Sequence, residues 1–446
     1  MAAPPAETLP RGVRLTTAEL LRLAIPSAVF AVLTNAFRAV DQYWIQGVGT
    51  EAQAAIGAST FVVILFYAAF VLIAAGAGPL VARAEGAGDA LGVRRVLGAS
   101  TGGALGVAAV VSAAGVLGAD WIAWLVGLDG PTAQEFATYL RVLSWTLLPL
   151  VFTPLVDQCF ISLGNARMPM LLHAVSLALN IVLTPVLIFE LDLGIAGAAL
   201  ASNLSRAVTT SVGLWLLTRR TGLTRQDVDL GPHLRKVLRI GAPAAMGIAT
   251  YTLVYWAMLK TSISPLGPEV NAALGIGFNA LEGFTWPAFT GVSMAVGSLV
   301  GRSLGAGRPD QAWAAVRLAL PFSTGLGVLA TAVFWFGGET LTGLFTQDPS
   351  VHAHATTYTL ILAWSQVFVA WEALAEGVLG GAGDTRAVFW ASFPLNALRV
   401  PLAWVLAFPL GLAAPGIWWA INGTTMAKAL LKGWLVRRGR WATLEI

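Results

Sequence analysis

The chain has 446 residues, of which 57% are hydrophobic and 11% are charged, and its formal net charge is +4. Soluble globular domains contain about 25% charged residues, so this composition excludes a soluble protein and predicts an integral membrane protein of the lipid bilayer. The single cysteine excludes an internal disulfide and a cysteine metal cluster, and the four scattered histidines show no metal-ligand spacing, so we expect no metal or cofactor. The net positive charge does not predict nucleic-acid binding, because the basic residues of membrane proteins gather in cytoplasmic loops.

Twelve apolar segments of membrane-spanning length follow one another along the chain, separated by joints that contain glycine, proline or charged residues. The start of the chain is basic, as in a secretory signal. The apolar run behind it is longer than a signal peptide and lacks a convincing cleavage site, so we expect a retained first helix. The approximate centres of the twelve segments are Leu33, Phe66, Val107, Leu148, Leu179, Thr209, Thr250, Thr285, Val328, Trp364, Leu398 and Met426.

The first segment, from Leu20 to Gln46, carries Arg38 and Asp41 inside its apolar run. A carboxylate in hydrocarbon costs about 2.5 to 3.5 kcal/mol even on the lenient insertion scale, so it survives only where a partner, water or an ion compensates it. Arg38 and Asp41 lie three residues apart, on one side of a helix, which allows a self-neutralising ion pair. We favour the alternative, a place on a proton or ion pathway.

Polar residues form stripes on three predicted helices of the first half. An isolated Asn or Ser is usually helix glue, contributing about 0.6 kcal/mol per interhelical hydrogen bond. Three stripes around one acid instead favour a site with an aqueous cavity. The stripes are Asn35, Arg38, Asp41 and Gln42 on the first helix, His173, Asn180 and Thr184 on the fifth, and Ser202, Asn203 and Arg206 on the sixth.

The two halves of the chain repeat each other at a separation of about 219 residues. Four matches in order predict a duplication of six helices, and because six is even, both repeats have the same orientation in the membrane. The polar stretch at residues 219–236 is then a cytoplasmic linker between lobes at 1–218 and 237–446. The matches are ARAEGAGD with GRSLGAGRPD, SLGNAR with GAGDTR, LNIVLTP with LNALRVP, and Asn203 with Asn422.

The second half offers two deep acids, Glu282 and Glu372, as functional candidates. Glu372 and Glu376 are one helical turn apart and repel each other, so at least one of them is expected to be protonated, paired or at the membrane surface. Glu376 occupies the repeat position of Asp157, and we interpret both as interfacial structural groups. Other polar residues of this half are Tyr251, Tyr255, Lys260, Asn279, Asn396, Arg399 and Asn422.

The loop charges predict the topology. With the N-terminus in the cytoplasm, the inner loops receive most of the arginines and the outer loops receive acids, as the positive-inside rule requires, and both termini are then cytoplasmic. Arg141 and Lys260 are exceptions that we attribute to burial in the bundle. The inner residues are Arg83, Arg94, Arg95, Arg167, Arg302, Arg308, Arg386 and the basic linker, and the outer ones are Glu51, Asp120, Asp129, Glu135, Glu190, Asp192, Glu269, Glu339 and Asp348.

These features together resemble the multidrug and toxic compound extrusion (MATE) family over nearly the whole chain. The resemblance rests on Pro26 and Asp41 followed by GVGTEAQAAIG, on the ARAEGAGD and GRSLGAG loops, and on GAGDTR. It implies an all-α membrane protein with twelve helices in two pseudo-two-fold-related lobes around a V-shaped central cleft. It further implies antiport of amphipathic, often cationic compounds against protons or sodium by alternating access, in a monomer of the prokaryotic plasma membrane, with the DNA-damage-inducible-protein-like branch as one possibility.

The resemblance also implies site residues. The family's coupling acid falls on Asp41, its kink proline on Pro26 as a hinge, its helix-four tyrosine on Tyr139 and its helix-five asparagine on Asn180. Some prokaryotic members carry a second acid where this chain has Thr184. Glu282 and Glu372 resemble acids that other branches use in the second lobe. The full candidate set for cation coupling and the substrate cavity is Asp41, Arg38, Gln42, Tyr139, Asn180, Thr184, Asn203, Arg206, Glu282 and Glu372.

Two other functions remain open from the sequence. A flippase for lipids or lipid-linked precursors, built on a related twelve-helix plan, would use arginines that line a cavity for an anionic head group. The arginines available for it are Arg38, Arg141, Arg206 and Arg399. An intramembrane enzyme would need a nucleophile with a base, or a metal set, and the sequence offers neither. No Walker motif is present to bind ATP.

Overall fold

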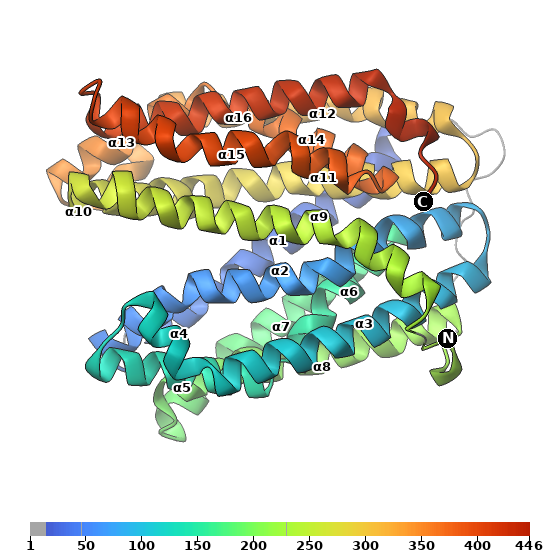
Figure 1. Ribbon diagram of the computed structural model, residues 1–446, viewed down its shortest axis with the longest axis horizontal. Coiled ribbons are helices and arrows are strands. Elements are labelled where there is room, and N and C mark those ends of the chain that lie inside the picture. Colours follow the sequence, from blue (N-terminus) through green and yellow to red (C-terminus); the bar gives the residue numbers. More distant parts are fainter. Residues whose placement is uncertain (1–14, 46, 229) are drawn as a thin grey trace. The chain divides into compact units, whose positions relative to one another are not determined.

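The computed structural model describes residues 15–45, 47–228 and 230–446, and these residues form helices and turns without a strand (Figure 1). The α-helices are α1 (Thr17–Ile45), α2 (Thr50–Gly86), α3 (Ala90–Leu117), α4 (Ala119–Val126), α5 (Gly130–Trp145), α6 (Leu148–Ser162), α7 (Arg167–Pro185), α8 (Gly194–Thr221), α9 (Pro232–Met258), α10 (Pro268–Gly275), α11 (Glu282–Gly305), α12 (Pro309–Gly343), α13 (Pro349–Ala363), α14 (Gln366–Ala382), α15 (Thr385–Ala407) and α16 (Ala413–Arg438). Three π-helical stretches, η1 (Val186–Glu190), η3 (Leu259–Ile263) and η5 (Ile276–Leu281), adjoin α7, α9 and α11, and short 3-10 turns are η2 (Arg225–Asp227), η4 (Ser264–Leu266) and η6 (Arg440–Thr443).

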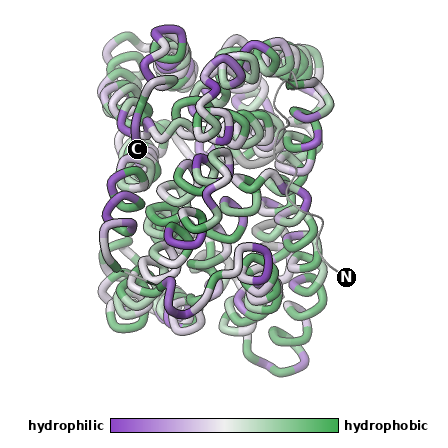
Figure 2. The backbone as a smooth tube through the Cα atoms, turned by 90° about the vertical axis from the view of Figure 1, so that its right-hand side faces the viewer, coloured by the Kyte–Doolittle hydropathy of each residue, from purple (hydrophilic) through white to green (hydrophobic). Residues whose placement is uncertain are grey.

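The helices confirm the prediction of an all-helical membrane protein. Six of them are long and apolar enough to cross a bilayer alone, and two bent pairs raise the number to eight in the described part of the chain. Hydrophobic residues occupy most of the helical path in Figure 2. Large apolar side chains also cover the outside, as shown by Leu117 and Phe336, which are 85% and 84% exposed. A surface of this kind is compatible with lipid rather than with water.

The fourth predicted segment of each half is broken in the middle. α5 and α6 bend by 59° between Trp145 and Leu148, and α13 and α14 bend by the same 59° between Ala363 and Gln366. The predicted segment centres Leu148 and Trp364 thus fall at the two bends. The equal bends at equivalent positions support the predicted duplication.

The repeated loop motifs have a geometrical reason. Gly88 and Gly307 have φ angles of +71° and +69°, and Gly164 and Gly383 have +80° and +87°. This left-handed conformation ends a helix at low cost only when the residue is glycine. The acids behind two of these glycines cap the next helix, because Asp89 accepts a 2.8 Å hydrogen bond from the Gly92 amide and Asp384 accepts one of 3.2 Å from Ala387.

The chain divides into two compact units. The first contains Phe30–Ala245, and the second contains Met246–Ile446 together with the described residues before Phe30. Both boundaries lie inside long helices, α1 and α9, within one turn after Pro26 and Pro243. The first half of α1 thus groups with the second unit, and the first half of α9 groups with the first.

Each unit has its own apolar core. In the first unit, α2 packs against α3, α5 and α6, and α7 packs against α8. Its core contains the buried side chains of Phe136, Leu140 and Ile45. In the second unit, α11 packs against α12 and α14, and α15 packs against α16, around a core that contains Tyr358 and Trp418.

The stretch predicted as a linker contacts α3 through η2. Asp227 in η2 accepts hydrogen bonds of 3.0 and 3.2 Å from the Arg94 guanidinium at the start of α3. The Thr224 amide and hydroxyl each donate a 2.7 Å bond to the same carboxylate. These bonds, from Thr224 first and Arg94 second, lower the pKa of Asp227 to about 2.

Candidate functional site

Asp41, near the C-terminal end of α1, is bound by neutral polar side chains of α7 and α8. The Ser202 hydroxyl donates a 2.8 Å hydrogen bond to Asp41 Oδ2. The Asn180 amide donates a 3.4 Å bond to Asp41 Oδ1 and a 3.2 Å bond to the Ser202 hydroxyl. The Asp41 side chain is only partly buried. The carboxylate is therefore compensated by neutral hydrogen-bond donors.

The spacing of polar residues on α7 and α8 creates this arrangement. His173, Ser176, Asn180 and Thr184 recur every three or four residues, so they form one buried face of α7. The first unit encloses that face between α6 and α8. The Thr184 hydroxyl donates a 2.7 Å bond to the Asn180 carbonyl of its own helix, so it does not supply a ligand to Asp41 in this arrangement.

Arg206 and Tyr139 complete the surroundings of Asp41. The Arg206 guanidinium lies over the Phe37 ring of α1, 4.4 Å from the ring centre, and interacts electrostatically with Asp41. Tyr139 of α5 is buried in the core of the first unit and also lies near enough to Asp41 for an electrostatic interaction. Five of the predicted residues, Asp41, Asn180, Thr184, Arg206 and Tyr139, are thus brought together.

The side chains of Arg38 and Gln42 lie outside the described part of the structure. The predicted pairing of Arg38 with Asp41 therefore stays a prediction. Ser202, which the sequence placed only in a stripe, is the side chain that makes the shortest described bond to Asp41. The sequence did offer one indication of this position, since Ser202 lies four residues before Arg206 and therefore on the same face of the helix.

Asn203 points away from Asp41, toward the broken fourth segment. Its amide donates a 3.0 Å bond to the Leu143 carbonyl and a further bond to the Thr146 hydroxyl. The repeat-related Asn422 donates a 2.7 Å bond to the Ile361 carbonyl at the other bend. A helix end leaves backbone carbonyls without partners. The two asparagines satisfy those carbonyls, so Asn203 has a structural environment rather than a place beside Asp41.

The second unit gathers a separate polar group around Arg399, which we call the Arg399 cluster. Arg399 is 1% exposed and donates bonds of 2.9 and 3.0 Å to the Thr424 and Thr425 hydroxyls of α16. It also donates a 3.4 Å bond to Tyr255. Glu282, at the start of α11, accepts a hydrogen bond from Tyr358 and interacts electrostatically with Arg399. The predicted candidate Glu282 therefore sits among tyrosines and one arginine.

Glu372, the other deep acid, is held by two lysines that the sequence analysis did not name. Lys428 Nζ lies 3.0 Å and Lys432 Nζ 2.6 Å from Glu372 Oε1. Lys432 also pairs with Glu376 at 2.5 Å. Both acids are thus paired, which is one of the outcomes expected from their repulsion. The sequence offered an indication of this pairing, because two lysines lie four residues apart inside the last apolar segment, where a charge needs a partner.

The family comparison adds an independent observation. The chain matches the model of the family described as MatE twice, at residues 26–186 and at 243–405. The two matches start 217 residues apart, which agrees with the repeat seen in the loops and bends.

Individual relatives and solved structures agree with that match. The chain is 30% identical to the probable multidrug resistance protein NorM of Deinococcus radiodurans, over 97% of this chain and 98% of the relative. It is 26% identical to the protein of the same name from Thermotoga maritima, over 95% and 92%. A MOP superfamily transporter from Pyrococcus furiosus has the same fold, with a TM-score of 0.89 at 21% identity over 96% of both chains. An outward-facing MATE family transporter superposes with a TM-score of 0.87 at 22% identity, over 95% and 96%.

Proposed function

This chain belongs to the MatE family, and we propose that it couples the export of small molecules to the entry of a cation that binds at Asp41. It is a multidrug efflux transporter that works by cation-coupled antiport. The name of its relatives, probable multidrug resistance protein, supports drugs as the cargo, and we expect these to be amphipathic and often cationic. The cation is a proton or a sodium ion.

The bonding of Asp41 is the observation that carries this proposal. An intramembrane acid is kept where it has a partner or a function. The described contacts of Asp41 are hydrogen bonds from Ser202 and Asn180, with Arg206 acting at longer range. Neutral donors stabilise the ionised carboxylate without occupying it permanently, so a cation can bind and leave.

Cation binding at Asp41 alters the forces on α1. Neutralising the carboxylate removes its attraction to Arg206 and weakens its hydrogen bonds from Ser202 and Asn180. The segment of α1 that follows Pro26 then loses one of its attachments to α7 and α8. A single charge that crosses a potential of 100 mV releases about 2.3 kcal/mol, which is sufficient to shift a two-state equilibrium by more than tenfold.

The remaining predicted features belong to the same proposal. The transporter acts as a monomer in the plasma membrane of a prokaryote, with both termini and the docked linker in the cytoplasm. Pro26 serves as a hinge because it removes one backbone hydrogen bond of α1 just before the boundary between the units at Phe30. Assignment to the DNA-damage-inducible-protein-like branch stays a prediction, since the relatives above carry the name NorM.

The bonding of the arginines argues against a flippase. An anionic head group would need arginines that are free to bind it. Arg141 pairs with Asp120, and Arg399 is bonded to Thr424, Thr425 and Tyr255. Two of the four arginines proposed for that function therefore already have partners.

The decisive experiment is transport by purified protein in proteoliposomes, with sodium and proton gradients imposed separately. We expect efflux of a fluorescent cationic dye to respond to one of the two gradients, and Asp41→Asn to reduce that response at least about tenfold, the size of a typical coupling free energy. Asp129→Asn, which neutralises an acid at the start of α5, serves as the matched control and should keep the full response. An undiminished response in Asp41→Asn would overturn the proposal.

A further inference from the structure

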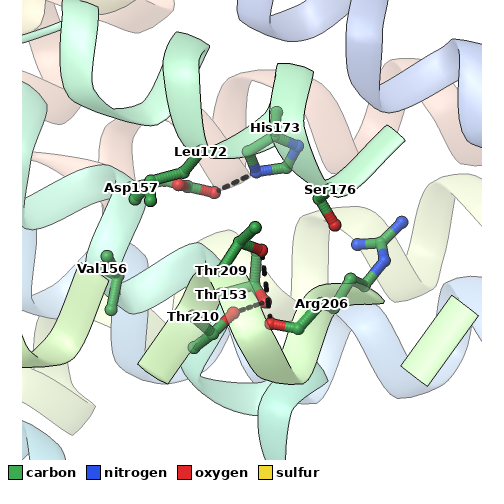
Figure 3. Close-up of a pocket in the computed structure, with 9 residues that line it drawn as sticks. All are labelled: Thr153, Val156, Asp157, Leu172, His173, Ser176, Arg206, Thr209 and Thr210. Atoms are coloured by element: carbon green, nitrogen blue, oxygen red, sulfur yellow. Dashed lines mark hydrogen bonds and ion pairs between the residues drawn. The ribbon is translucent and has the colours of Figure 1, made fainter. Parts of the chain in front are cut away.

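Besides Asp41, the first unit contains a buried pair of titratable side chains, His173 and Asp157. His173 Nε2 on α7 is 2.9 Å from Asp157 Oδ2 on α6, and the two residues are 5% and 6% exposed. Figure 3 shows the imidazole and the carboxylate facing each other across the gap between their helices. Burial of an aspartate is costly unless it is paired or protonated, so the charge of Asp157 has to be neutralised by a proton or by His173.

The other nitrogen of His173 contacts α1. His173 Nδ1 lies 3.4 Å from the Thr34 hydroxyl oxygen, and that hydroxyl lies 3.0 Å from the Phe30 carbonyl, to which it donates. The Phe30 ring meets the His173 ring edge-on, with 4.6 Å between the centres. Phe30 is also the first residue of α1 that belongs to the first unit. His173 therefore touches α1 one turn after Pro26.

The number of protons available decides which of these bonds can exist together. The Thr34 hydroxyl has one proton, so while it donates to Phe30 it can only accept from His173. Nδ1 must then carry a proton. Because Asp157 faces Nε2, that bond needs a second proton, on Nε2 or on the carboxyl. The observed set of contacts is complete only when the pair holds one proton more than an ionised aspartate with a neutral histidine.

Loss of that proton forces a choice at Thr34. With Nε2–H donating to the Asp157 carboxylate, Nδ1 becomes an acceptor. The Thr34 hydroxyl then either turns to His173 and releases the Phe30 carbonyl, or leaves Nδ1 without a donor in a buried place. An unsatisfied buried polar group costs about 1 to 3 kcal/mol. The protonation state of the pair is thereby coupled to a hydrogen bond on α1.

A small polar cavity adjoins the pair (Figure 3). Its volume of about 10 Å³ is room for one water molecule. The buried Ser176 hydroxyl, between His173 and Arg206 in the view, has no hydrogen-bond partner among the described residues and lines this cavity. Arg206 lines it as well, and the same arginine interacts electrostatically with Asp41 and Asp157. A water bonded to Ser176 would connect the pair with the surroundings of Asp41.

The charges around His173 come from several helices. Asp157 on α6 pairs with His173, and Arg206 on α8 interacts electrostatically with both Asp157 and Asp41. The titratable groups Cys159 on α6, Tyr139 on α5 and Tyr67 on α2 interact electrostatically with these charged residues. Asp157 is the one that makes direct contact with His173.

We propose that Asp157 and His173 form a second proton-binding site of the first unit, and that its occupancy controls the hydrogen bond from Thr34 to Phe30 on α1. The part of this inference that concerns transport rests on the proposed function, because it assigns the site a regulatory effect on the helix that carries Asp41. The part that concerns proton binding does not depend on transport.

The direct test follows the protons on the histidine nitrogens by nitrogen-15 NMR of the histidine-labelled full-length protein in lipid nanodiscs. The chain has four histidines, so the His173 signals are assigned from their loss in His173→Gln. We expect spectra recorded from about pH 5 to pH 8, where imidazole changes charge, to contain two forms of His173, one with a proton on Nδ1 and one without it, in a ratio that depends on pH. An Nδ1 that is unprotonated throughout this range, or one that keeps its proton throughout it, contradicts the proposal.

Two variants test the two contacts of the site. Asp157→Asn removes the facing charge and lets the Asn amide donate to Nε2, so the neutral imidazole with a proton on Nδ1 satisfies every contact, and we expect Nδ1 to keep its proton as the pH rises. Thr34→Val keeps the shape of Thr34 and removes its hydroxyl, so the Nδ1 proton should be exchanged with water faster than in the parent. The same loss of the Nδ1 proton with rising pH in Asp157→Asn and in the parent would show that the pair is not a coupled site.

Transport separates this inference from the proposed function. We expect His173→Gln to keep gradient-driven efflux while flattening its dependence on pH, whereas Asp41→Asn loses the response to the gradient. His352→Gln is the matched control, because its imidazole bonds only to the Glu339 carbonyl among the described residues. If the pH profile of His173→Gln is unaltered, the regulatory effect is contradicted and the proposed function is not. If coupling survives in Asp41→Asn, the proposed function is contradicted and proton binding by Asp157 and His173 is not.

Discussion

The Ser202 hydroxyl on α8 donates a 2.8 Å hydrogen bond to Asp41 Oδ2 on α1. This bond joins two helices that are 161 positions apart at these residues, at the acid proposed for coupling. A hydrogen bond to a charged group contributes about 1.5 to 3 kcal/mol. The ionised state of Asp41 therefore depends on a serine that has no charge of its own.

We expect Ser202→Ala to weaken coupling without removing it. Loss of the donor makes the ionised carboxylate less favourable, so release of the bound cation slows and gradient-driven efflux falls about tenfold or more, in line with the energy of one such bond. Ser205→Ala is the matched control, since Ser205 is buried on the same helix and donates to the Ser202 backbone carbonyl instead. Equal losses in both variants would indicate a general disturbance of α8.

The linker should detach from α3 only in strong acid. The pKa of Asp227 is lowered to about 2, so its contribution to docking is complete above pH 4, the ordinary range for aspartate, and disappears as the pH falls through about 2. Hydrogen exchange of the amides at residues 224–228 measures this, with protection kept at pH 4 and lost near pH 2. Thr224→Val removes one of the donors and should move the loss of protection to higher pH. Protection that is already lost at pH 4 in the parent would contradict the prediction.

The buried lysine network should be sensitive to the loss of one partner. Lys432→Met leaves Glu376 unpaired and Glu372 with Lys428 alone, and breaking a buried pair in this way costs about 3 to 5 kcal/mol. We expect a clear fall in the thermal unfolding temperature in detergent. Adding Glu376→Gln to that variant should recover part of the loss, because the unpaired charge is gone.

A control for this prediction is Lys236→Met, which removes an exposed lysine at the start of α9. Exposed substitutions usually change stability by less than about 0.5 kcal/mol. If Lys432→Met is as mild as Lys236→Met, the network does not hold α14 to α16.

Two neighbouring glycines of α14 should respond differently to alanine. A Cβ at Gly377 would overlap the backbone of Ser293 on α11, whereas one at Gly380 would meet nothing within 4 Å. Backbone cannot move aside as a side chain can, so Gly377→Ala should destabilise the protein by about 1 to 3 kcal/mol. Gly380→Ala should be neutral or stabilising by up to about 1 kcal/mol, since alanine favours a helix. Thermal unfolding of both variants gives the comparison, and equal unfolding temperatures would mean that α11 and α14 do not approach closely.

The sequence by itself determined the membrane class, the helical segments, the duplication and the candidate acid. Apolar runs and loop charges are local properties, and Asp41 stands out because a carboxylate in such a run is costly. The repeated glycines of the loops could also be recognised in the sequence, because the positive φ angles of Gly88 and Gly307 allow few other residues at these positions. The bends at Leu148 and Trp364 were missed, since the two helices of each broken segment together are long and apolar enough to be counted as one membrane span.

Only the tertiary structure decided which side chains meet across helices. Asn203 and Ser202 are adjacent in the chain, yet one bonds the bend of α5 and the other bonds Asp41. Lys432 reaches Glu372 across 60 positions. Such pairs depend on the rotation and the axial offset of one helix against another, and those are set by the packing of the whole unit. Helical periodicity says which residues share a face, and packing decides what that face meets.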